Sequence, residues 1–221
     1  MCGVRHDGIM VGMETIPPKP RMRVLVACEF SNTVRDAFLR RGHDAYSCDL
    51  ERADYPNRNF ERHIRGDVRP LLRERWDLVI AHPPCTHLAA SGAVAHSVGS
   101  YQYNPNKHKL MLNGAALFIE CLYANSDRIC VENPIMLGKA KDLIGVGPTQ
   151  TIQPWWFGHQ YSKATCLWLT RLPPLVPTNI VNPICPWVSS GTDKIRIGKV
   201  DPKERSRTFQ GIADAMAAQW G

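Results

Sequence analysis

Short apolar runs alternate with longer amphipathic segments along most of the chain. Apolar runs that stop at polar residues or proline predict buried strands, and these lie at 23–27, 45–48, 64–68, 77–81 and 128–134. Apolar residues at helical spacing predict helices, and these lie at 31–42, 70–75, 107–125 and 211–220. Because strands and helices alternate, the pattern predicts an α/β fold with a doubly wound, mostly parallel sheet.

Two more apolar runs, at 152–157 and 164–169, lie close together and predict a hairpin at one edge of the sheet. Ser31 is expected to cap the helix that follows the first strand, since its hydroxyl suits the N-cap position. The polar stretch 91–106 predicts a long loop, which in a compact domain is usually functional or mobile.

The predicted elements fit one domain over 22–221. Residues 1–21 carry Gly, Pro and Met without periodicity, which predicts a flexible extension. Proline, glycine and charge dominate 171–207, which predicts an extended basic arm.

Basic residues exceed acidic ones by 27 − 20 = 7, and the isoelectric point is near 9.1. This balance favours a polyanionic partner such as nucleic acid, although a basic surface also serves solubility. No apolar run approaches membrane-spanning length and the N-terminus lacks a signal-peptide pattern, so we expect a cytoplasmic protein without a membrane span. The 8 cysteines show no CxxC spacing, which argues against a disulfide framework or a metal site.

A thiol and a carboxyl group follow two of the predicted strands. Cys85 comes after the strand 77–81 and two prolines, and Glu132 lies near the end of the strand 128–134. Because ligands collect beyond the carboxyl ends of parallel strands, both side chains are expected to face one crevice. Cys85 would act there as a nucleophile and Glu132 as an acid that bonds a ring nitrogen. His82 and His87 flank the thiol, and either imidazole could tune it.

Asp49 and Asp67 close two neighbouring strands. Acidic residues in such positions commonly hold the hydroxyl groups of a ribose or an amine of a nucleoside cofactor. The pair therefore points to a ligand with an adenosyl group, whereas either residue alone would equally suit a helix cap.

These motifs together resemble the DNA cytosine-5 methyltransferase family, with the Pro83-Pro84-Cys85 turn and the Val131-Glu132-Asn133 strand as its most specific parts. The resemblance runs in the family's order from about residue 23 onward. It implies a Rossmann-like fold of the class I methyltransferases that depend on S-adenosyl-L-methionine, and it implies double-stranded DNA as partner. The reaction implied is methylation of C5 of a flipped-out cytosine through a covalent adduct of Cys85.

The resemblance also assigns roles to individual residues. Cys85, Glu132 and Lys163 would be catalytic. Contacts to the cofactor would come from Phe30, Ser31, Asn32, Thr33, Asp49, Asp67, Val68, Pro83, Gly211 and Ile212. Contacts to the substrate would come from Pro84, His87, Asn133, Thr165, Arg205 and Arg207.

The chain departs from the family pattern in three places. Asn32 and Val34 stand where the cofactor loop normally has glycines, and Lys163 and Thr165 stand where arginines are expected. Lysine keeps the charge but lacks the forked donor geometry of arginine. Only 171–207 occupies the place of a target-recognition domain, which implies low or short sequence specificity.

Other readings of the residues stay open. A zinc-dependent base deaminase would need an HxE motif and a second cysteine three residues after the first, and neither is present. An adenine amino-methyltransferase normally has an aromatic residue after the prolines, where this chain has Cys85. Without a recognition domain, the substrate could be a free nucleotide or RNA, or the donor a modified form of S-adenosyl-L-methionine. A degenerate fold that only binds nucleic acid is the alternative without catalysis.

Overall fold

A computed structural model of the chain describes residues 20–54, 59–89, 104–186 and 206–221. Seven strands form one sheet in the order β3-β2-β1-β4-β5-β8-β6, and β7 pairs with β9 outside it. The strands of the large sheet are β1 (Arg23–Ala27), β2 (Asp44–Asp49), β3 (His63–Arg65), β4 (Leu78–Ala81), β5 (Ile129–Pro134), β6 (Gln150–Ile152) and β8 (Thr165–Thr170). The small pair is β7 (Tyr161–Ser162) and β9 (Cys185–Pro186).

The strand directions confirm the expected doubly wound, mostly parallel sheet, which is Rossmann-like. β1 pairs in parallel with both β2 and β4, so the winding reverses between these strands. β4 and β5 are also parallel, whereas β8 runs antiparallel to β5 and to the edge strand β6. In such a sheet ligands bind at the carboxyl ends of the strands beside the reversal.

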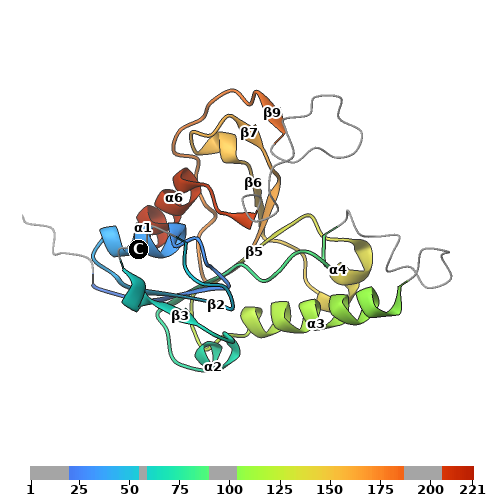
Figure 1. The fold of residues 1–221 in the computed structure, drawn as a ribbon. Coiled ribbons are helices and arrows are strands. Elements are labelled where there is room, and N and C mark those ends of the chain that lie inside the picture. The colour runs from blue at the N-terminus through green and yellow to red at the C-terminus, as the bar shows by residue number, and fades with distance from the viewer. Residues whose placement is uncertain (1–19, 55–58, 90–103, 187–205) are drawn as a thin grey trace, which may run out of the picture.

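Helices cover both faces of the sheet (Figure 1). The helices are α1 (Thr33–Arg40), α2 (Arg69–Leu72), α3 (Pro105–Leu122), α4 (Gly138–Ile144) and α6 (Gln210–Trp220). α1 and α6 pack together over one face, where Phe38, Met216 and Trp220 fill a buried apolar core. α2, α3 and α4 cover the other face, and Phe118 of α3 meets Trp168 of β8 there with ring centroids 4.9 Å apart.

Some predicted boundaries are wrong. The strand expected over 152–157 ends at Ile152, because Pro154 starts a short 3₁₀ helix, η3 (Pro154–Trp156). The helices expected from the sequence do not include α4, which follows β5 and ends where Gly145 adopts a φ of 75°. α3 begins at Pro105, since Asn104 caps it by accepting a hydrogen bond from the backbone N–H of Lys107.

Residues 171–184 contain no helix or strand. Their first part lies beside α6, and 178–184 donate backbone hydrogen bonds to η3 and the turn after it. The indole N–H of Trp220 donates to the carbonyl of Pro173 over 3.0 Å, and the Gln219 side chain exchanges two hydrogen bonds of 2.8 Å with the backbone of Val176. Leu175 is buried beside them. The first part of the expected arm therefore packs on the domain, and most of its basic residues fall within 187–205, outside the described part of the chain. The predicted extension 1–21 lies almost entirely outside it as well.

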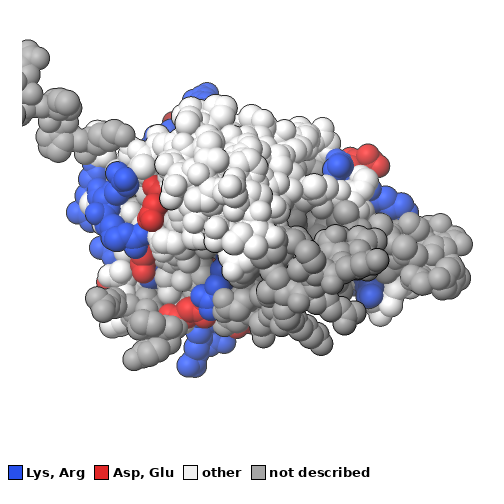
Figure 2. Space-filling view, turned by 90° about the horizontal axis from the view of Figure 1, so that it is seen from above, with Lys and Arg blue, Asp and Glu red and all other residues white. Residues whose placement is uncertain are grey.

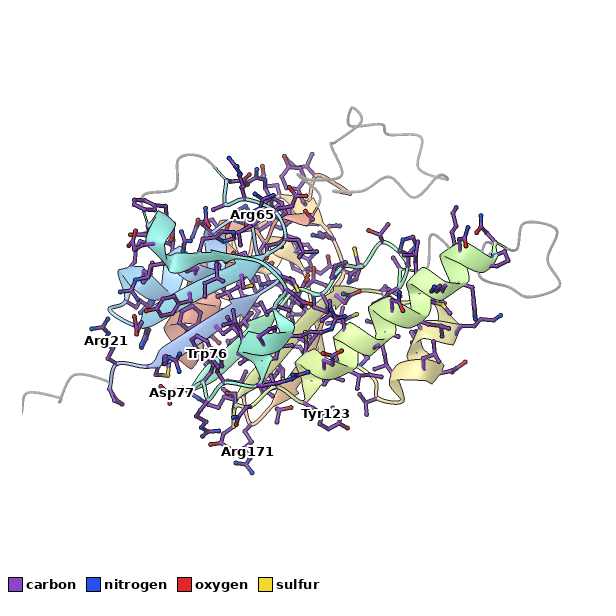
Figure 3. All side chains as sticks on the ribbon, turned by 60° about the horizontal axis from the view of Figure 1, so that its bottom comes forward. Arg21, Arg65, Trp76, Asp77, Tyr123 and Arg171 are labelled. Atoms are coloured by element: carbon purple, nitrogen blue, oxygen red, sulfur yellow. The ribbon has the colours of Figure 1, made fainter. Side chains whose placement is uncertain are left out.

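At the amino edge of the sheet, contacts join the start of β1 to Trp76 and Asp77, which precede β4 (Figure 3). The backbone N–H of Arg23 donates to Asp77 over 2.7 Å, and the Arg23 guanidinium lies 4.2 Å from the centre of the buried Trp76 ring.

No helix in the described residues is long and apolar enough to cross a membrane.

Candidate active site at the carboxyl edge of the sheet

Three strands that end side by side place Glu132 next to His82. Ala27, Ala81 and Val131 are partners in the register of β1, β4 and β5, so the residues that follow them lie in one row. His82 Nδ1 is 3.5 Å from Glu132 Oε2, and the two side chains are only 10% and 18% exposed. The sheet therefore holds an imidazole and a carboxylate together in a largely buried place.

Competing influences set the protonation of Glu132. Burial by itself raises the pKa of its carboxyl group, but the hydrogen bond from His82 and the charges of Lys163 and His82 outweigh it and lower the pKa. Glu132 thus favours the ionised form although it is buried.

The turn that carries Cys85 is tied to β5. Asn133 donates its side-chain N–H to the carbonyl of Pro83 over 2.8 Å, and Asn133 is itself 1% exposed. Beyond the thiol, Ala89 forms an antiparallel bridge with Met136, which follows β5. The structure therefore brings the half-buried Cys85 to the same edge as Glu132, as the sequence predicts. Of the flanking residues, Pro84 is exposed and His87 is half-buried.

The turn between β1 and α1 is built around Glu29, which sequence analysis missed. Its buried carboxylate accepts hydrogen bonds from the backbone N–H groups of Val34 and Arg35, over 2.7 and 3.2 Å, and from the hydroxyl of Ser31 over 3.2 Å. Ser31 is therefore not the cap of α1: the residue before the helix is Asn32, and Glu29 satisfies the free amides. A charged residue directly after a buried strand was the available signal.

This turn takes an unusual backbone path. Cys28 and Asn32 have φ angles of 58° and 64°, in the left-handed region that favours glycine. Asparagine tolerates this region better than most residues, which explains how the loop forms without the glycines expected of it. Burial raises the pKa of Glu29, and the charge of His82 and the two α1 amides partly offset this effect.

Glu29→Ala is expected to lower the free energy of unfolding by about 2–4 kcal/mol, because two buried amides at the start of α1 lose their acceptor. Urea unfolding would measure the change. Glu74→Ala is a suitable control, since Glu74 is half-exposed and only pairs with Arg23 on the surface. Equal stabilities of the Glu29 variant and wild type would contradict the capping role.

Asp49 and Asp67 differ in their surroundings. Asp49 ends β2 and accepts a hydrogen bond from the backbone N–H of Glu51 over 2.9 Å, and burial raises its pKa. Both oxygens of Asp67 are bonded to Arg69, one to its backbone N–H and one to its guanidinium, and these contacts lower the pKa of Asp67. Leu50, beside Asp49, is 71% exposed and offers an apolar surface. Asp49 is thus the better placed of the two for a ligand, while Val68 is buried in the core.

Lys163 and Thr165 lie on the far side of Glu132, next to β8. The Lys163 backbone N–H donates to Gln153 over 2.9 Å, and its ammonium group lies 5.9 Å from the centre of the Phe209 ring. Thr165 is buried, and its hydroxyl donates to the Lys163 carbonyl over 3.2 Å. The turn is thereby fixed with the Lys163 charge close enough to lower the pKa of Glu132.

Most of the remaining predicted site residues contact other residues of the domain. Arg207 forms an ion pair with Asp54 and lies 5.6 Å above the Phe30 ring. Gly211 donates its backbone N–H to His159 Nε2 over 3.0 Å, and Ile212 is buried in the core. Thr33 is the first residue of α1, and Arg205 falls outside the described residues.

Buried polar atoms without a partner cluster at this edge. Three buried polar atoms at this edge form no hydrogen bond with any residue in the described part of the chain. They are Asn32 Oδ1, His82 Nε2 and Asn133 Oδ1. They follow β1 and β4 or lie at the end of β5. Buried polar groups are rarely left unsatisfied, so these atoms mark a place where a polar ligand fits. The described residues contain no group of three or more His, Cys, Asp and Glu side chains that could hold a metal ion.

No model of a known protein family matches the chain, and no curated protein matches it. Among solved structures, it is similar to a protein described as a candidate DNA modification methyltransferase encoded within an E. coli prophage, with 15% identity and a TM-score of 0.44 over 72% of this chain. The chain spans about half of that protein, 51% of its length. It is also similar to a TehB-like SAM-dependent methyltransferase from Corynebacterium glutamicum, with 16% identity, a TM-score of 0.37 and coverage of 68% of this chain and 81% of that one.

Proposed function

We propose that the protein is a methyltransferase that transfers a methyl group from S-adenosyl-L-methionine to C5 of cytosine in DNA. The observation that carries the proposal is the hydrogen bond from Asn133 to the Pro83 carbonyl. It locks the turn of the nucleophile Cys85 onto the strand of the acid Glu132. A thiol and a carboxyl group at one edge of a Rossmann-like sheet are what addition to a pyrimidine ring requires.

The residues beside β1 and β2 fit the nucleoside part of the cofactor. Asp49 can accept hydrogen bonds from ribose hydroxyls, and the exposed Leu50 provides an apolar surface for a purine. Asn32 Oδ1 is one of the buried polar atoms that such a ligand could satisfy. The amides of Val34 and Arg35 are already bonded to Glu29, so they would not hold the amino-acid part. When bound, S-adenosyl-L-methionine supplies an electrophilic methyl group.

The protein's own groups activate the base. The Cys85 thiolate forms a bond to C6 of a flipped-out cytosine, since the ring carbons cannot be reached within the stack. Glu132 delivers a proton to N3, and C5 becomes nucleophilic. After C5 is methylated, the C5 proton passes to solvent, the Cys85 sulfur leaves C6 as a thiolate, and N3 returns its proton to Glu132, which restores the ring. Lys163, held near Glu132, would bond the base carbonyl or a phosphate.

Double-stranded DNA is the favoured substrate, because the chain carries a formal charge of +7. In Figure 2 the largest group of Lys and Arg side chains lies at the left end of the face with acidic side chains beside it, and smaller groups lie at the right end and along the lower rim. Several basic side chains of the described residues are paired with carboxylates, as in the ion pairs Arg40–Asp214 and Arg62–Asp44. We therefore assign backbone contact mainly to the basic segment 194–207, of which only 206–207 belong to the described residues. Low or short sequence specificity is the corresponding proposal, because 171–207 is the segment that stands in the place of a target-recognition domain.

The test is to trap the adduct on DNA that contains 5-fluorocytosine. Fluorine at C5 cannot leave as a proton does, so wild type with S-adenosyl-L-methionine should become covalently attached, and intact mass should show it. Cys85→Ser should give no adduct, whereas Cys166→Ala, which changes a buried cysteine of β8, should still give one. Cofactor binding without an adduct would favour a nucleotide, RNA or a modified donor instead. Loss of cofactor binding as well would favour a fold that only binds nucleic acid.

A further inference from the structure

The proposed reaction demands a proton that Glu132 does not itself hold. N3 of the base must be protonated as Cys85 adds to C6, so a proton donor must stand at Glu132. Yet the neighbours of Glu132 lower the pKa of its carboxyl group. A group in contact with Glu132 is then the nearest source of the proton.

His82 is the group in contact with Glu132. Its Nδ1 lies 3.5 Å from Glu132 Oε2, and its backbone N–H donates to the Ala27 carbonyl over 2.9 Å, which fixes it beside β1. Its Nε2 is buried and has no hydrogen-bond partner among the described residues. One nitrogen thus faces the carboxylate and the other is unsatisfied, an arrangement that a purely structural histidine would rarely keep.

Carboxyl groups lie on both sides of the ring. The buried carboxylate of Glu29, on the turn after β1, interacts with His82 electrostatically from one side. Glu132, on β5, faces it from the other side, and Lys163 lies beyond Glu132. Ionisable side chains therefore follow one another along the edge of the sheet, in the order Glu29, His82, Glu132 and Lys163. A proton on His82 would stand between two carboxyl groups in a place that excludes most water.

We propose that His82 is a positioning residue that stores the proton which Glu132 passes to N3 of the base. The inference rests on the proposed function. As the Cys85 sulfur bonds to C6, the His82 Nδ1–H bond breaks and its proton moves to Glu132 Oε2. The carboxyl group then turns and passes this same proton to N3. His82 becomes neutral, and Glu132 ends ionised as it began. When the sulfur leaves C6, N3 returns the proton along the same path, so no net proton is consumed by the pair.

His82→Asn is the informative substitution, because the asparagine amide can still donate a hydrogen bond to Glu132 but cannot carry the proton. We expect the rate of adduct formation on 5-fluorocytosine DNA to fall on the order of 10²-fold. In wild type this rate should also decline at high pH as His82 loses its proton, and the variant should lack this decline. His108→Asn, on α3, is the matched control and should keep both the rate and the pH profile of wild type.

A wild-type rate and pH profile in His82→Asn would overturn the proposal, since the hydrogen bond alone would then suffice. Thermal unfolding of the variant near the wild-type midpoint shows that the comparison concerns folded protein. If the variant is unstable, His82→Gln offers a second amide with a longer reach, and the same loss is expected from it.

A measurement without substrate separates this inference from the proposed function. The His82 ring can be titrated by NMR in protein labelled with ¹⁵N histidine. In Glu132→Gln the midpoint of this titration should move to lower pH, because the carboxylate at 3.5 Å is gone. If the midpoint did not move, the proposal that His82 stores the proton would be wrong, even if wild type forms the adduct. A moved midpoint without any adduct in wild type would instead refute only the cytosine-5 reaction.

Discussion

Glu132→Gln is expected to lower the rate of methyl transfer to DNA by about 10²–10⁴-fold, the usual size of a general acid contribution. The amide has nearly the same shape as the carboxyl group and can still touch N3. It cannot pass on a proton, however, and it removes the negative charge that faces His82 and Lys163. The loss should appear in kcat, because binding of the cofactor beside β1 and β2 does not involve Glu132. Transfer of a radioactive methyl group measures the rate, and calorimetry with S-adenosyl-L-methionine measures binding.

A second carboxylate separates the role of Glu132 from a general effect of lost charge. Glu120 lies on α3, is partly exposed and pairs with Arg69 over 3.1 Å. Glu120→Gln should therefore retain wild-type kcat. If the Glu132 variant also retained it, Glu132 would not be the acid, and a carboxylate that merely stabilises the edge would explain the structure better.

Gly211→Ala is expected to lower the free energy of unfolding by about 3 kcal/mol. A Cβ atom at this position would lie 2.0 Å from the Phe157 carbonyl oxygen and 3.1 Å from His159 Nε2. The first of these is backbone, so relief requires the start of α6 to move away from the turn after η3. This movement also breaks the hydrogen bond from the Gly211 backbone N–H to His159 and weakens the packing of α6 against the apolar core. Chemical unfolding followed by tryptophan fluorescence would measure the loss.

The same substitution at Gly114 should raise the free energy of unfolding instead of lowering it. Gly114 lies within α3, and a Cβ there would meet Leu88 at 3.5 Å, an ordinary van der Waals contact. Alanine favours a helix interior over glycine, so Gly114→Ala should stabilise the protein by about 0.5 kcal/mol. If Gly211→Ala were as stable as Gly114→Ala, α6 would not pack against the Phe157 carbonyl as it does in the structure.

The sequence was sufficient to predict the strands that end in chemically active residues. β4 and β5 are apolar runs that end next to proline and polar residues, so the positions of Cys85 and Glu132 followed from local pattern alone. Their common location followed from the rule that parallel strands end at one edge of the sheet. The residue roles at this edge, beyond their placement, remain predictions.

The partnerships of Glu29 and His82 could not be predicted in the same way. Glu29 caps a helix from three residues before its N-cap, outside the usual capping window, and His82 finds Glu132 only because β4 and β5 are neighbours. The cap assigned to Ser31 failed because a carboxylate two residues earlier is the stronger acceptor for the same amides. Local signals identify a residue's chemistry, whereas its partner depends on the order of strands in the sheet.

The packing of α6 on α1 has a consequence for the kinetics of folding. The ion pair between Arg40 and Asp214 joins positions 174 residues apart, and Phe38 and Trp220 share the same buried core. Contacts so distant in sequence form late, after the rest of the sheet has assembled. During synthesis, the apolar face of α1 therefore stays uncovered until α6 has left the ribosome. Chaperone capture of nascent chains should accordingly be greatest for chains that stop short of α6.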